Sequence, residues 1–170
     1  METIKYKLSR KKKEFLQNMQ EYLDTKLYFY GSIQRFDYID NISDIDICIF
    51  TDNMDSTILS LQQYLNVEKK HIKKFYINSK ERKIMGGYKV FYKNTFIKTE
   101  ISIYETKNKE EVLQDFINTI YMPYFYSIIL LILKYMNSVI PIPYHTLKHK
   151  IINLYKKEPN TYFFVTLENK

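Results

Sequence analysis

The hydrophobic positions in the N-terminal part of the chain follow two periods, one helical and one extended. Residues 9–25 carry apolar side chains near helical spacing, which predicts a helix capped by the serine at its start. The segment "KLYFYGS" predicts a short strand that ends at Gly31. The segment "DIDICIF" alternates strictly, which predicts a strand with isoleucines on one face and Asp44 and Asp46 on the other. Residues 55–66 then predict a second helix.

The middle of the chain has the pattern of strands joined by turns. The segment "HIKKFYI" predicts a third strand, and we expect Gly86-Gly87 to break the chain after it. The segment "YKVFYKNTFIKTEISIY" predicts a hairpin that turns at Lys93-Asn94. In its second arm the apolar positions share one face, and Glu100 lies on the polar face.

The last third of the chain is predominantly helical in pattern. Residues 109–120, 124–136 and 144–155 predict three helices, the last two separated by "PIP". The tail "NTYFFVTLENK" is interpreted either as a further strand or as an arm packed on the body. This order of elements predicts an α+β, or mixed α/β, fold with a mixed sheet flanked by helices. We expect a domain at 1–106, and a C-terminal helical extension at 107–170 that packs on it.

Composition and charge indicate which kind of partner the protein binds and in which cellular compartment it is found. The chain has 26 Lys+Arg against 19 Asp+Glu, a net charge of +7, which favours polyanionic partners such as nucleic acid or nucleotide phosphates. Cys48 is the single cysteine, so a disulfide within the chain is excluded and a reducing environment is expected. The N-terminal residues lack the apolar core of a signal peptide. We therefore expect an intracellular protein, cytoplasmic or nuclear.

The apolar segment 120–140 is long enough to cross a membrane and needs a separate interpretation. Pro123 interrupts it, and Lys134 falls within it. A buried helix of the domain accounts for the same composition, so we expect no membrane association.

Asp44 and Asp46 stand two residues apart on a predicted strand, so both side chains project from the same face. Carboxylates this close raise each other's pKa unless a positive group lies between them. Mg²⁺ is bound in this way by one or two carboxylates and by substrate phosphates. Glu100 supplies a third oxygen ligand if its strand pairs alongside. Three carboxylates from neighbouring strands suit a site for two Mg²⁺ ions, with Mn²⁺ as a substitute.

Gly31-Ser32 lies at the end of the strand that precedes these carboxylates. A glycine there permits a tight turn and a close approach of the backbone to phosphate. The residues that follow can begin a helix whose N–H groups bind anions. Ser32 adds a hydroxyl donor, and Arg35, one turn on, can reach the same phosphates.

The combination of Gly31, Ser32, Asp44, Asp46 and Glu100 resembles the polymerase β-type nucleotidyltransferase superfamily, across residues 27–104. The resemblance implies a nucleotidyltransferase-type sheet, with the three carboxylates as metal ligands and catalytic residues. It implies nucleotide binding by the Gly-Ser pair.

Two subfamilies are similar to different parts of the chain. "GSIQR" is similar to repair-type DNA polymerases, which implies that Arg35 contacts triphosphate. "YSIILLILKYMN" is similar to the helix after the catalytic domain of terminal adenylyl- and uridylyltransferases, which implies a phosphate contact by Lys134. The chain lacks both a Gly-Gly-x-Ser nucleotide-recognition motif after Lys134 and a helix-hairpin-helix segment, so the base selected is not defined.

These features predict a Mg²⁺-dependent enzyme that transfers a nucleoside monophosphate from an NTP to a hydroxyl and releases pyrophosphate. The expected acceptor is a nucleic-acid 3′ end, RNA ahead of DNA. Transfer of AMP to a protein hydroxyl and a catalytically silent nucleotide- or RNA-binding module are the alternatives. His145 and His149 have zinc-ligand spacing, but without a neighbouring acid they indicate a basic, partly exposed helix face.

Overall fold

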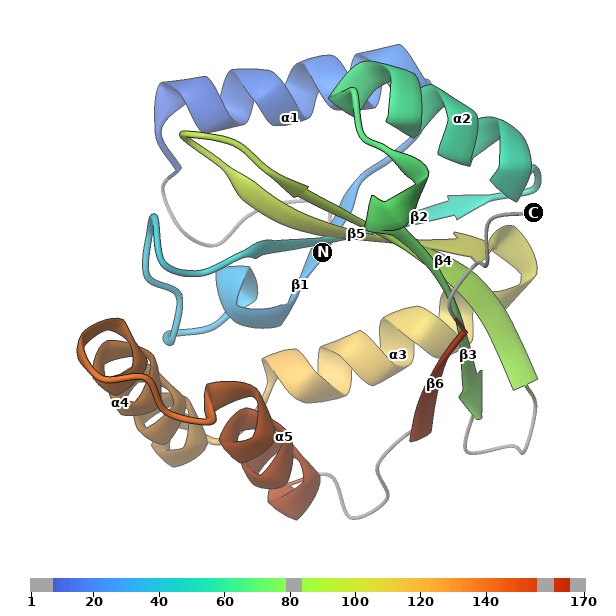
Figure 1. The fold of residues 1–170 in the computed structure, drawn as a ribbon. Helices are drawn as coiled ribbons and strands as arrows, with labels where there is room; N and C mark the ends of the chain where they lie inside the picture. Colours follow the sequence, from blue (N-terminus) through green and yellow to red (C-terminus); the bar gives the residue numbers. More distant parts are fainter. Residues whose placement is uncertain (1–7, 79–83, 156–160, 166–170) are drawn as a thin grey trace.

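The computed structural model describes residues 8–78, 84–155 and 161–165, which form a sheet with helices on both faces (Figure 1). Helices α1 and α2 cover one face, and α3, α4 and α5 lie on the other side. The helices are α1 (Arg10–Leu23), α2 (Met54–Leu65), α3 (Lys109–Ile120), α4 (Tyr124–Val139) and α5 (Tyr144–Tyr155). The strands are β1 (Tyr28–Tyr30), β2 (Ile45–Thr51), β3 (Ile72–Asn78), β4 (Ile84–Lys93), β5 (Lys98–Glu105) and β6 (Thr161–Val165).

Within the described residues the sheet has six strands, in the order β1-β2-β5-β4-β3-β6. Neighbours β2 and β5 are parallel, and the other neighbouring strands are antiparallel. The expected mixed sheet flanked by helices is therefore confirmed. Of the two interpretations of the tail, the strand is correct, because β6 pairs with β3. A segment of the expected C-terminal extension thus joins the sheet, and the boundary at 106 stays a prediction.

The alternation in "DIDICIF" separates two cores. The isoleucines of β2 pack with apolar residues of α1 and α2, including Met19 and Leu61. On the opposite face, Cys48 and Phe50 pack with Phe116 of α3. Burial of apolar side chains on both faces fixes β2 between the two helical layers, and its N-terminal end, where the aspartates lie, borders the cavity described below.

The sequence predicts a break at Gly86 and Gly87. This prediction is wrong, because both glycines lie inside β4. The reason is a close approach of neighbouring groups. A Cβ atom at Gly87 would lie 2.6 Å from the backbone oxygen of Ile103 and 2.7 Å from the ring of Phe75. Glycine at this position therefore lets β4 lie close against β5 and the core aromatic ring.

Gly87→Ala is expected to lower the free energy of unfolding by about 1–3 kcal/mol, because the added methyl group meets a backbone atom that cannot move aside. Gly86→Ala is the matched control, since its Cβ would meet only the ring of Tyr76, at 3.4 Å. We expect that variant to stay within about 0.5 kcal/mol of the wild type. Urea unfolding of both variants measures the difference, and equal stabilities would contradict this account.

Helix α4 differs from the buried helix that its composition predicts. Ser127, Leu130 and Lys134 are buried, whereas Phe125 and Val139 on its outer side are 67% and 81% exposed. The reason is its position, because α4 packs against the body and α5 along one side only. No single helix of the described residues is long and apolar enough to cross a bilayer, although the bent pair 106–120 and 124–139 meets that test together.

Candidate active site

A cavity of about 760 Å³ brings together the residues singled out in the sequence. It lies where β1, β2 and β5 face α4 and α5. All seven predicted site residues line it: Gly31, Ser32, Arg35, Asp44, Asp46, Glu100 and Lys134. The sequence therefore located the residues of one cavity, although their roles stay predictions.

The three carboxylates come from two neighbouring parallel strands. Asp46 and Glu100 are register partners of β2 and β5, and Asp44 directly precedes β2. The pKa of Asp46 is raised to about 6, mainly by burial and also by the negative charges of Glu100 and Asp44, against the opposing charge of Lys148. The carboxylates thus lie close enough to repel one another, as their spacing predicts.

Two lysines that the sequence reasoning missed pair with the outer carboxylates. Lys98 lies 2.7 Å from Asp44, and Lys89 of β4 pairs with Glu100. Lys98 shares the polar face of its strand with Glu100, so strand periodicity could have indicated it. Lys89 reaches the site only through the register of β4 on β5. In the part of the chain that the structure describes, no three carboxylate, histidine or cysteine side chains are arranged as a metal site.

Gly31 and Ser32 form the corner between β1 and a single 3-10 turn, η1 (Gly31–Gln34). Gly31 has φ +70°, and a Cβ there would lie 1.9 Å from an Oδ atom of Asp46. Only glycine fits this corner, because a side chain would displace the carboxylate. The expected helix after the Gly-Ser pair is thus limited to one short turn.

Arg35 and Lys134, the two cations predicted to contact phosphate, both bind Asp37. The Arg35 guanidinium donates to the two Asp37 carboxylate oxygens at 2.8 and 3.1 Å. The Lys134 ammonium donates to the Asp37 carbonyl at 2.6 Å and lies 3.1 Å from its carboxylate. Asp37 is 1% exposed and was missed in the sequence, where nothing signals its contact with a helix so distant along the chain.

The pKa values of this buried cluster follow from its charges. Burial raises the pKa of the Asp37 carboxyl, but Arg35 and Lys134 outweigh it and hold the pKa below its ordinary value of 3.8. Burial lowers the pKa of Lys134, and Asp37 opposes that shift only in part. Asp37 therefore holds both cations in the protein interior.

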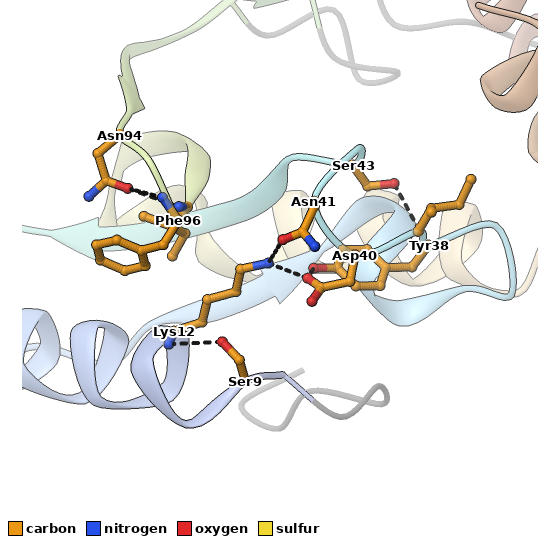
Figure 2. Close-up of polar contacts among 10 residues, drawn as sticks. Ser9, Lys12, Tyr38, Asp40, Asn41, Ser43, Asn94 and Phe96 are labelled. Atoms are coloured by element: carbon orange, nitrogen blue, oxygen red, sulfur yellow. Dashed lines mark hydrogen bonds and ion pairs between the residues drawn. The ribbon is translucent and has the colours of Figure 1, made fainter. Parts of the chain in front are cut away.

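A second polar network fixes the loop between η1 and β2 (Figure 2). The Lys12 ammonium of α1 donates to Asp40 and, at 3.1 Å, to Asn41. The Tyr38 hydroxyl also donates to Asp40, at 3.1 Å. Ser43, the residue before Asp44, accepts from Lys134 at 3.0 Å. The loop is thus held between α1 and α4, which positions Asp44 at the rim of the cavity.

Helices α3 and α5 complete the cavity wall. The ring of Tyr30 stacks on Phe116 of α3 with centroids 3.9 Å apart, and its hydroxyl hydrogen bonds to Ser102 at 3.0 Å. His145 and His149 of α5 line the cavity and are partly exposed, in line with the basic helix face expected there.

Comparison with protein-family models identifies the family of this chain. The model described as "Nucleotidyltransferase domain" matches residues 9–118 of the chain. The chain belongs to the nucleotidyltransferase family. The expected family is therefore confirmed, and the matched nucleotidyltransferase domain contains the Gly-Ser corner and all three carboxylates. Lys134 and α5 lie beyond the matched residues.

Solved structures of the Cid1 poly(U) polymerase and of a GLD-2/RNP-8 complex are similar to this chain. The Cid1 poly(U) polymerase with MgGTP bound has 16% identity and a TM-score of 0.45 over 78% of this chain and 44% of that one. The same polymerase with Mg 3′-dATP bound has 17% identity and a TM-score of 0.46, over 78% and 43%. The GLD-2/RNP-8 complex gives 12% identity and a TM-score of 0.43, over 88% and 59%.

This chain thus spans less than two thirds of each of these structures. No curated protein sequence matches it.

Proposed function

We propose that this nucleotidyltransferase moves a nucleoside monophosphate from an NTP to an acceptor hydroxyl and releases pyrophosphate. The observation that carries the proposal is the cavity itself, in which the Gly31-Ser32 corner faces carboxylates from two adjacent strands. The proposed acceptor is an RNA 3′ end, which the net charge of +7 supports because it favours a polyanion.

The donor set of the site fits Mg²⁺. All three groups are carboxylates, the oxygen ligands that this ion prefers. Burial and the charges of Glu100 and Asp44 raise the pKa of Asp46, so a cation bound among the three carboxylates would relieve their mutual repulsion. We propose that Asp44, Asp46 and Glu100 hold two Mg²⁺ ions, with Mn²⁺ as a substitute. Bound there, the ions would lower the pKa of the attacking hydroxyl and neutralise phosphate charge.

The protein itself would bind the phosphates and accept the proton of the acceptor hydroxyl. The backbone at Gly31 lies close to Asp46, so phosphate bound at this corner would lie beside the carboxylate and the cation that it holds. The Ser32 hydroxyl donates to phosphate. Glu100 accepts the proton of the acceptor hydroxyl, in exchange for its present contact with Lys89. Release of Lys98 from Asp44 frees that carboxylate for the cation.

A catalytically silent nucleotide- or RNA-binding module is the second candidate. Lys89 pairs with Glu100, and Lys98 pairs with Asp44. These pairs favour the silent module, because each lysine neutralises a carboxylate that we propose as a metal ligand. A module of this kind would bind nucleotide without a divalent cation and would transfer nothing.

Turnover with each of the four NTPs, with and without an RNA or DNA primer, separates these functions. We expect Mg²⁺-dependent extension of the RNA 3′ end with release of pyrophosphate, and slower extension of DNA. Label transferred to protein without extended RNA would overturn the proposed acceptor. Nucleotide binding with no product from any acceptor would support the silent module.

A further inference from the structure

Lys148 differs from the other cations around the cavity. Arg35 and Lys134 are held by Asp37, Lys98 lies on Asp44 and Lys89 lies on Glu100. Lys148 also lines the cavity, but it makes no ion pair with any residue in the ranges that the structure describes. No carboxylate of the described residues therefore lies within ion-pair distance of its ammonium, which acts on Asp46 only at longer range.

Lys148 lines the same cavity as the three carboxylates. It lies on the face of α5 that borders the cavity, between His145 and Ile152. Of the charged groups that shift the pKa of Asp46, Lys148 acts most strongly, and it also lowers the pKa of Lys134. Lys148 thus lines the same cavity as the strand carboxylates and as Lys134 of α4, and its charge acts on both.

Phosphate binding by Arg35 and Lys134 alone would be weak for an electrostatic reason. Both cations are buried, and they share the negative charge of Asp37. An incoming phosphate would have to compete with that carboxylate for their donors. Lys148 is half-buried and has no carboxylate partner among the described residues, so its ammonium can reach phosphate without breaking an ion pair.

We propose that Lys148 binds the β- and γ-phosphates of the NTP, in the cavity that the Gly31-Ser32 corner also lines. The inference rests on the proposed function, because it assigns a residue to the triphosphate of that substrate. A lysine ammonium is a point charge suited to phosphate oxygens of varied geometry. The residue lies outside the matched nucleotidyltransferase domain, so α5 would contribute directly to the site.

Lys148→Met tests the proposal, with Lys150→Met as its matched control. Lys150 lies on the same helix and is exposed, and it does not line the cavity. Both variants remove one positive charge, so general attraction of anions falls equally. We expect Lys148→Met to weaken binding of MgATP at least tenfold, and to leave binding of AMP within about twofold of the wild type. Lys150→Met should change neither, and Lys148→Arg should recover most of the MgATP affinity.

Calorimetric titration of each full-length variant with MgATP and with AMP provides these values, and thermal unfolding confirms the fold. Equal MgATP affinities of Lys148→Met and Lys150→Met would overturn the inference, as would a parallel loss of AMP binding. If the wild type binds MgATP and Asp44→Ala/Asp46→Ala does not, equal affinities of the two lysine variants would exclude the role of Lys148 and leave the proposed function intact. Absence of Mg²⁺-dependent binding by the wild type would overturn the proposed function, and this inference with it.

Discussion

Asp46→Asn is expected to reduce the rate of nucleotidyl transfer by about a thousandfold. Asp46 lies at the centre of the carboxylate group, between Glu100 across the parallel pair and Gly31 at the corner. Asparagine keeps the shape of the side chain but removes the charge that we propose holds the cation. Loss of that cation costs several kcal/mol of transition-state stabilisation, and each 1.36 kcal/mol corresponds to a factor of ten. Single-turnover extension of a labelled RNA primer measures the rate.

Asp52→Asn is the control for this variant. Asp52 follows the other end of β2, is exposed and lies outside the cavity. Its substitution changes the net charge by the same amount, and we expect transfer at the wild-type rate. A rate for Asp46→Asn within tenfold of the wild type would exclude Asp46 as a ligand of a catalytic metal.

Asp37→Asn is expected to lower the free energy of unfolding by about 3–5 kcal/mol. The substitution leaves the buried cations Arg35 and Lys134 without the carboxylate that binds both. Removal of one partner from a buried ion pair has costs of this size, because an uncompensated charge stays in the interior. Chemical denaturation at neutral pH measures the loss. Glu14→Ala removes the exposed pair with Arg10 and should cost about 0.5 kcal/mol or less.

The pH dependence of stability provides a separate check on the role of Asp37. Its pKa in the folded protein lies below 3.8, despite burial, because Arg35 and Lys134 favour the ionised form. A lowered folded-state pKa contributes stability above the unfolded-state pKa, and that contribution is lost as the pH falls through the folded-state value. The difference in stability between wild type and Asp37→Asn should therefore be constant near neutral pH and shrink below about pH 4. A constant difference down to pH 2 would contradict the assignment.

The parts of the site that could be predicted from the sequence depend on local rules. Strand alternation places Asp44 and Asp46 on one face whatever the rest of the fold is, and the same rule places Glu100 on the polar face of its strand. Glycine before serine at a strand end likewise indicates a close backbone approach, which the geometry of Gly31 and Asp46 explains.

The features that could not be predicted depend on contacts between distant segments. Asp37 meets Lys134 only because α4 packs over the loop before β2, and no pattern near either residue encodes this contact. Lys89 reaches Glu100 through a pairing register that the sequence does not specify. Local propensity predicts a break at Gly86 and Gly87, whereas the close packing of Phe75 against β4 explains the glycine at position 87. Apolar side chains of α4 are exposed because only one side of this helix packs against the rest of the protein, and composition does not reveal which side that is.

Binding of MgATP to the wild type and to Asp44→Ala/Asp46→Ala tests the central claim most directly. The claim is that cations held by these strand-end carboxylates bind the triphosphate against the Gly31-Ser32 corner. Calorimetric titration with and without Mg²⁺ should show saturable binding by the wild type that requires the ion, and none by the double variant. Equal affinities of the two proteins, or wild-type binding that is indifferent to Mg²⁺, would contradict the claim.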